Sequence, residues 1–385
     1  MSTKKLYFMN MCLGAMNAVA LQMLPLILYD KQFNYSQVAF LLGLVYLSSF
    51  FIPLIGLINK RYLGDIGTFK LLMATFVLIS IIMFESSTFV AMIGLVILFS
   101  LARVSIFPVN DSFLTKQVKQ HKINYGFIKS GASMGFGIGM LSFTLLSNIL
   151  HTNYNSAFVY MALLGFISFI IISTLPKDKI KPKELKNNLK TTNKTDYLKY
   201  SLLVLIYITY YGALGVRISY LSTYYVEFGY TTLFISITTF FMIIPEIIIM
   251  PFYNKLFGKF DKAKLIAIAI TLGIIQILLY LVFYNNPLML LITSLFNGFQ
   301  IMLFFPSFFN LLQGSLSEHD ATPGFLMNMT IQAVIVGFIM VLLIKPLYTH
   351  FESTIPVFWV IIGMMIISYI PVLIFYLKYP RYKNK

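Results

Sequence analysis

Charged residues are scarce in this chain. Asp, Glu, Lys and Arg make up 11% of its 385 residues, whereas a soluble globular domain carries about 25%. So few charges cannot cover a water-exposed surface, which excludes a soluble globular protein. The apolar residues, 58% of the chain, occur in long runs, and a run of about 20 apolar residues spans a bilayer as a helix.

Cysteine and the motifs of nucleotide or metal chemistry are also lacking. Cys12 is the one cysteine, so no internal disulfide forms. No GxxxxGK[ST] loop is present, so ATP cannot drive the protein directly. There is no HExxH motif and no Cys/His cluster, and the four histidines lie in predicted loops or at helix ends. We therefore expect no cofactor, no metal and no enzymatic activity.

What is present is a series of about twelve apolar runs. They cover residues 6–29, 36–58, 69–85, 88–112, 125–149, 156–175, 198–225, 231–253, 264–284, 287–313, 324–348 and 354–377. The first run is too long for a cleavable signal peptide and carries Asn10, Asn17 and Gln22. The sequence predicts an all-α membrane protein with about 12 transmembrane helices.

The basic residues predict how these helices are oriented. The net charge is +16, and with a cytoplasmic N-terminus 25 of the 29 lysines and arginines fall on the cytoplasmic side. This is the positive-inside pattern. It predicts a multi-pass protein of the cytoplasmic membrane with both termini in the cytoplasm. It also assigns the positive charge to topology, so nucleic acid is not expected as a partner.

A polar segment divides the chain into two parts. Residues 177–196 read KDKIKPKELKNNLKTTNKTD, which predicts a cytoplasmic linker between six-helix halves at 1–176 and 197–385. The halves share Gly and Pro anchors at an offset of 198, among them Gly14-Ala15 with Gly212-Ala213 and Phe107-Pro108 with Phe305-Pro306. A parallel repeat of this kind resembles the plan of major facilitator transporters.

Two basic loops strengthen that resemblance. The loop after the second run and the loop after the eighth both carry Asn-Lys, then Gly, then further basic residues. They resemble the family's G-x-x-x-D-R-x-G-R-R signature, with Asn59 and Asn254 where its Asp is expected. The resemblance implies a cytoplasmic gate built from Asn59, Lys60, Arg61, Asn254 and Lys255, although two ordinary basic loops would read the same way.

The start of the fifth run resembles lactose permease and its relatives, which include phenylpropionate-permease-like proteins and nucleoside–proton symporters. It reads Tyr125-Gly126-Phe127-Ile128-Lys129 and continues into a Gly-rich turn of helix. Lys129 matches the second Arg of the family's aromatic-Gly-Arg-x-Arg pattern, and Asp111 matches the preceding fourth-helix carboxylate. In lactose permease that pair helps form the sugar site and couple it to protons. The tenth run lacks that permease's His and Glu, which argues against lactose.

Glycines follow in the same run at positions 131, 135, 137 and 139. Small residues at such spacing let helices pack closely in lipid, so we expect them to serve helix packing. The run lacks the Gly-Pro pair that drug–proton antiporters usually show. This favours symport and leaves an efflux antiporter of the same superfamily as the alternative.

Polar residues inside the first-half spans are candidate site residues, because charge in a membrane is costly. Arg103, Asn110 and Asp111 share one face of the fourth span, and Asn17 lies in the first. Asp111 and Lys129 are expected at similar depth on neighbouring helices. They form a substrate site, a structural ion pair, or two groups that reach the interface separately.

The second half offers Arg217 in mid-span and Glu246 after Pro245. Glu246 is the best-placed single carboxylate for proton binding, since burial raises the pKa of a carboxyl group. The alternative is a structural Arg217–Glu246 bond between adjacent helices. Asn297 and Gln300 on the tenth span are expected to bond a polar solute or each other.

Together these features predict a secondary active transporter, as a class and without a named substrate. We expect a permease for a small polar solute, coupled to protons and working as a monomer in the lipid bilayer. Interior cations outnumber interior acids, which favours a neutral, zwitterionic or anionic solute over a lipophilic cation. A non-transporting receptor or scaffold and a membrane-embedded enzyme are the alternatives from other classes.

Overall fold

The computed structural model describes residues 3–121, 125–174, 196–316 and 321–379. Its first-half elements are α1 (Thr3–Asp30), α2 (Tyr35–Leu47), η1 (Ser48–Phe51), α3 (Ile52–Ile58), η2 (Asn59–Leu63), α4 (Gly64–Glu85), α5 (Phe89–His121), α6 (Tyr125–Ile149) and α7 (Ser156–Ser173). Of the predicted linker, residues 177–195 lie outside the described residues.

The elements of the second half follow in the same way. They are α8 (Tyr197–Ile206), η3 (Tyr207–Tyr211), α9 (Gly212–Glu227), α10 (Thr232–Ile249), η4 (Met250–Phe252), α11 (Tyr253–Phe257), α12 (Lys262–Val282), α13 (Pro287–Gln313), α14 (Ala321–Ile339), η5 (Met340–Ile344), α15 (Lys345–Phe351), α16 (Ile355–Ile367) and α17 (Tyr369–Lys378). Every regular element in the described part is helical, which confirms the predicted fold class.

Eleven helical stretches of the described part are long and apolar enough to cross a membrane. One of them, Tyr35–Glu85, has 51 residues, far more than the roughly 20 that one crossing needs. The chain turns within it at η2, where Gly64 has a φ of +64° that favours glycine. This stretch therefore makes two crossings, and the described part makes about twelve.

Four predicted spans are interrupted by short turns of a different helix type, one of them by the 3₁₀ turn η4 between α10 and α11. The π-helical segments η3 and η5 separate α8 from α9 and α14 from α15, and the 3₁₀ turn η1 separates α2 from α3. Such bulges occur often at functional sites. They place Tyr211 at the last residue of η3, in the middle of a membrane crossing.

Polar side chains just before several helices cap their N-termini. Asn34 and Gln37 form a reciprocal capping box at the start of α2, and Asp261 accepts hydrogen bonds from the first turn of α12. These contacts satisfy backbone N–H groups that have no partner within the helix. They explain why the helices begin close to the predicted ends of the apolar runs.

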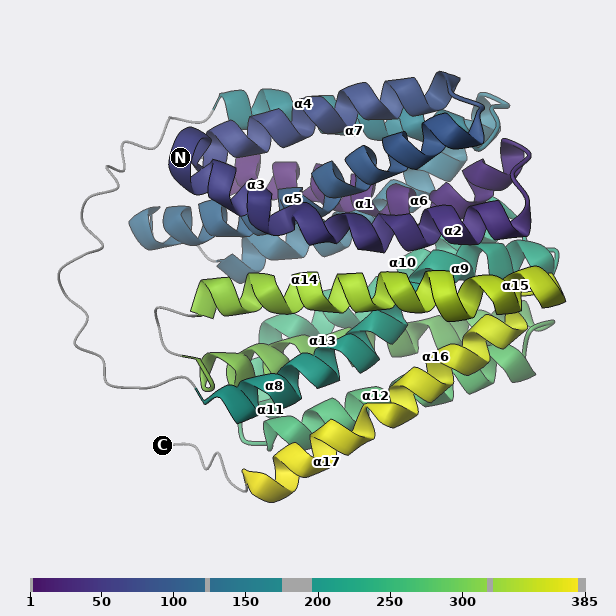
Figure 1. Cartoon of the computed structure of the whole chain (residues 1–385). Helices are drawn as coiled ribbons and strands as arrows, with labels where there is room; N and C mark the ends of the chain where they lie inside the picture. The colour runs from purple at the N-terminus through teal and green to yellow at the C-terminus, as the bar shows by residue number, and fades with distance from the viewer. Residues whose placement is uncertain (1–2, 122–124, 175–195, 317–320, 380–385) are drawn as a thin grey trace.

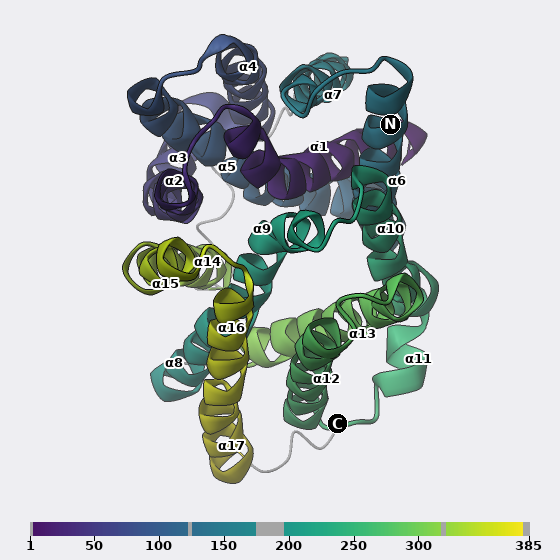
Figure 2. The ribbon, with the colours of Figure 1, turned by 90° about the vertical axis from the view of Figure 1, so that its right-hand side faces the viewer.

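Seen end-on, helices α1–α7 form one group and α8–α17 form a second group (Figure 2). The groups meet where α2 packs on α14 and α15, α6 packs on α10, and α1 packs on α9. Helix α1 begins and α17 ends at the same end of the bundle, at the left of Figure 1. We call it the basic end, because Lys4, Lys5 and Lys378 lie there, and we call the other the opposite end.

Glycines bring α1 and α6 unusually close together. A Cβ on Gly135 would lie 1.9 Å from the main-chain oxygen of Met11, and one on Gly14 would lie 1.9 Å from that of Ala132. Gly139 meets Ala15 in the same interface. The predicted packing role of these glycines is confirmed, although Gly137 faces α10 of the second half instead.

Candidate functional site

Polar side chains join α5 to α1 inside the first half. Arg103 donates from Nη1 to Asn17 Oδ1 over 2.7 Å, and Asn110 donates from Nδ2 to Asn10 Oδ1 over 3.0 Å. The two members on each helix are seven residues apart, which is about two turns. The predicted shared face of Arg103 and Asn110 is confirmed, and it faces α1. Asp111, the next residue, is half-buried.

Arg103 also lies near side chains of the second half. The hydroxyls of Tyr46 on α2 and Tyr211 on η3 are close enough to interact electrostatically with its charge. Tyr46 bonds to Ser219 of α9 over 3.0 Å between Oη and Oγ. We call Asn17, Tyr46, Arg103, Tyr211 and Ser219 the central cluster. It contains residues of both halves.

Arg217 has a different setting, entirely within the second half. Its guanidinium donates to the side-chain oxygens of Gln276, Asn297 and Gln300 on α12 and α13. Its side chain is 0% exposed. Among the described residues it makes no bond to Glu246, so the alternative of a structural Arg217–Glu246 pair is wrong. Its partners are amides because its side chain points toward α12 and α13.

Glu246 instead faces the first half. Ser133 Oγ on α6 donates to Glu246 Oε1 over 2.7 Å. Further hydrogen bonds cross the same boundary, from Thr239 to Gln22 over 2.7 Å and between Thr144 and Ser236 over 2.5 Å. We call these three pairs the polar seam. Sequence reasoning named Glu246 and missed Ser133, because a serine in a Gly-rich helix gives no signal of its own.

Four tyrosines join the halves near the opposite end of the bundle. Tyr29 of α1 and Tyr348 of α15 share a hydrogen bond between their hydroxyls. Tyr35 packs edge-on against both rings, at centroid distances of 5.6 and 5.2 Å, and Tyr220 packs against Tyr348 at 5.2 Å. Edge-to-face packing is favourable for aromatic rings. This tyrosine cluster links the two halves at the opposite end.

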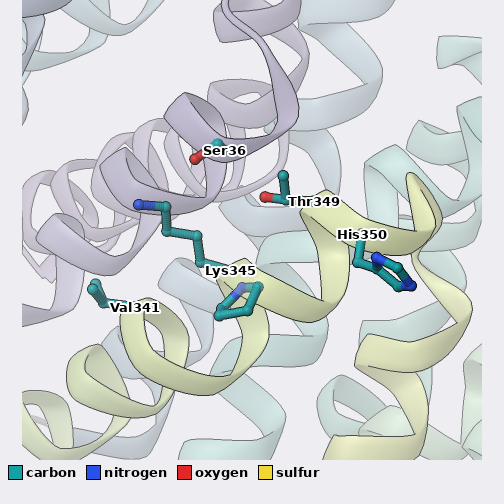
Figure 3. A pocket seen from close by; sticks show the side chains of 6 residues that line it. Ser36, Val341, Lys345, Thr349 and His350 are labelled. Atoms are coloured by element: carbon teal, nitrogen blue, oxygen red, sulfur yellow. The ribbon is translucent and has the colours of Figure 1, made fainter.

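A surface pocket of about 520 Å³ lies between α2 and α15, near the tyrosine cluster. Figure 3 shows Lys345 reaching from α15 toward α2 near Ser36, while His350 points away from them. The ammonium group of Lys345 lies 5.4 Å from the ring centre of Phe40. The pocket contains no member of the central cluster, so we do not assign the solute to it.

The predicted gate residues differ in their surroundings: one is hydrogen-bonded, two are exposed, and the side chains of the other two lie outside the described part. Asn59 donates to Asp65 Oδ1 over 3.0 Å and accepts from Thr68 over 3.3 Å, so a carboxylate does lie near Asn59, six residues further on in the first turn of α4. Arg61 and Lys255 are exposed. The side chains of Lys60, Asn254 and Lys129 lie outside the described part, so the Asp111–Lys129 pair stays a prediction.

The family follows from the sequence itself. The model of the Major Facilitator Superfamily matches residues 6–340. The chain belongs to the major facilitator superfamily. Solved structures of similar fold include a point mutant of the nucleoside transporter NupG, with 13% identity, 97% of this chain and 99% of that chain covered, and a TM-score of 0.77.

A second similar structure is an auto-inhibited peptide transporter of the POT family, with 10% identity, 100% and 97% coverage and a TM-score of 0.72. At such identities the likeness concerns the fold. No curated protein sequence matches this chain. As a major facilitator protein the chain is a membrane transporter and not an enzyme.

Proposed function

We propose that this major facilitator protein is a secondary active symporter that moves a small polar solute together with protons. It works as a monomer in the cytoplasmic membrane, with both termini and the linker in the cytoplasm. The observation that carries the proposal is the meeting of polar side chains from both halves within the membrane, at the central cluster and along the polar seam. Polar groups at that depth are costly, and they commonly mark the path of a solute or ion.

The contacts between the halves suit alternating access. In the central cluster and the polar seam they are single hydrogen bonds between side chains, such as Tyr46–Ser219 and Gln22–Thr239, and each contributes only about 0.5–1.5 kcal/mol. The halves can therefore exchange one set of contacts for another. In this proposal the tyrosine cluster is the closed gate on the outer side, and the solute leaves toward the basic end.

Glu246 is the proposed proton carrier. When ionised, its carboxylate only accepts hydrogen bonds, as it does from Ser133. When protonated, it also donates. Because Ser133 belongs to the other half, loading a proton changes a contact between the halves. Protonation of Glu246 thus changes a hydrogen bond across the boundary that must open during transport.

The names of the similar structures support a small polar solute. One is called a nucleoside transporter and another a peptide transporter. The interior arginines support a neutral, zwitterionic or anionic solute for this chain. Asn297 and Gln300 are occupied by Arg217, so we give them a supporting role and place the solute at the central cluster.

The test uses protein in liposomes and the small-molecule fraction of yeast extract. Mass spectrometry identifies the solutes that enter only protein-containing vesicles. A pH gradient, acid outside, should concentrate them, and a protonophore should abolish that accumulation. Glu246→Gln should lose accumulation but keep exchange of labelled for unlabelled solute, because a neutral side chain mimics the loaded carrier.

The matched control is Glu85→Gln, since Glu85 is an exposed carboxylate at the end of α4. It should accumulate solute as the unmodified protein does. Uphill accumulation by well-folded Glu246→Gln protein would end the assignment of this residue as proton carrier. Accumulation that needs sodium and ignores the protonophore would end proton coupling.

A further inference from the structure

The two interior arginines differ in how their charge is satisfied. Arg217 has three amide oxygens around it, is 0% exposed, and lies within one half. Among the described residues Arg103 has one hydrogen-bond partner, Asn17, and 7% of its surface is exposed. A guanidinium has five N–H donors, so most donors of Arg103 remain available to a bound group.

The charge of Arg103 has no anionic partner in the described part of the chain. Its electrostatic neighbours there are the phenols Tyr46 and Tyr211. A cation held between helices in a membrane needs a counter-charge or several hydrogen bonds to offset its desolvation. For Arg217 the protein supplies three amides. For Arg103 the described residues supply one amide, and 7% of the buried side chain stays exposed at the boundary between the halves.

We propose that Arg103 binds a carboxylate of the transported solute, so that the solute is a small organic acid or a zwitterion with a free carboxyl group. The proposal rests on the proposed transport function and names its substrate class. The planar guanidinium matches a carboxylate with two parallel hydrogen bonds. One cation in the central cluster matches one negative charge, which favours a carboxylate over a doubly charged phosphate.

The neighbours of Arg103 supply contacts for the rest of such a solute. Tyr46 and Ser219 offer hydroxyl groups, one from each half. Tyr211 packs edge-on against Phe305 at a centroid distance of 5.2 Å, and Phe305 stacks on Phe309 at 5.8 Å. All three rings are partly accessible. A carboxylate on Arg103 thus has polar groups on one side and an aromatic row for an organic body on the other.

The same binding would connect the solute to the boundary. Arg103 belongs to the first half, whereas Tyr211 and Ser219 belong to the second. A solute that bonds Arg103 and contacts Tyr211 therefore touches both halves at once. This is the condition for a solute to favour one arrangement of the halves over another.

The experiment compares Arg103→Gln, Arg103→Lys and Lys378→Gln in liposomes with the small-molecule fraction of yeast extract. Lys378 is an exposed basic residue at the end of α17, so its variant removes the same charge away from the cluster. We expect the solutes that enter through the unmodified protein to carry a carboxyl group. Their initial uptake at low concentration should fall by about a hundredfold or more in Arg103→Gln, the scale of losing one member of a buried charge pair.

Arg103→Lys keeps the charge but loses the planar fork, so it should recover part of the uptake, and Lys378→Gln should behave as the unmodified protein. Gel filtration and thermal unfolding of each variant separate loss of fold from loss of binding. Uncharged solutes that enter equally well through folded Arg103→Gln protein would overturn the proposal and leave the transport function standing. If no solute enters in a protein-dependent manner, the transport function itself fails.

Discussion

The close packing of α1 on α6 predicts that a methyl group added at Gly135 clashes with the main chain of α1, and not with one of its side chains. In Gly135→Ala the new methyl group would begin 1.9 Å from the carbonyl oxygen of Met11 and 2.7 Å from its carbonyl carbon. A real Cβ essentially never lies within 3.0 Å of a heavy atom from another part of the chain. The clash is with backbone, so no side-chain rotation can relieve it, and the two helices must move apart.

The expected cost follows from that displacement. Overpacking a well-packed interface by a methyl group costs about 1–3 kcal/mol, and the upper end is expected because a whole helix must move. The apparent melting temperature in detergent should fall by several degrees. The measurement is the amount of monodisperse protein left after heating, read by size-exclusion chromatography.

Two variants make the result specific. Gly94→Ala on α5 has nothing within 4 Å of the new methyl group, so it should keep or slightly raise stability, by about 0.5–1 kcal/mol, as alanine favours helix. Adding Met11→Ala to Gly135→Ala should not restore stability, because the clashing atom belongs to the main chain. If the apparent melting temperature of Gly135→Ala equals that of the unmodified protein, the interpretation of this interface is wrong.

Two further predictions concern the gate and the topology. Tyr348→Phe keeps the ring but removes the hydrogen bond to Tyr29, about 1 kcal/mol, so the opposite end should open about fivefold more often. Spin labels at the exposed loop positions 87 and 285 should then show a larger population of long distances, and an unchanged distribution would refute the gate. With Cys12 replaced by Ala, a cysteine at position 152 should react with a membrane-impermeant maleimide on intact cells. A cysteine at position 259 should react only after permeabilisation, and the reverse pattern would invert the proposed orientation.

The sequence predicted the fold because a bilayer imposes a local requirement. Each crossing needs about 20 apolar residues, and that length can be read from the chain without knowledge of any neighbour. The same holds for the shared face of Arg103 and Asn110, which depends only on helical periodicity. The glycine spacing of α6 likewise predicted close packing, as the contact of Gly135 with Met11 confirms.

The partners of the polar side chains were less predictable. The alternative of an Arg217–Glu246 bond is wrong, because Arg217 points toward α12 and α13 while Glu246 points toward α6. Gln276 was missed although a glutamine within a span is itself a signal, and Ser133 was missed because a serine in a Gly-rich helix gives no signal of its own. Position along a helix gives depth in the membrane, but the neighbour depends on the rotation of the helix about its axis.

Sequence alone therefore predicted the helical fold, about twelve crossings and the class of the protein. Only the tertiary structure decided that Arg103 lies at the boundary between the halves whereas Arg217 is enclosed within one of them. The physical reason is that the bilayer acts on each segment separately, through hydropathy and length. Rotation and register are decided by contacts between helices, such as those of Gly135 and Gly14, that come from distant parts of the chain.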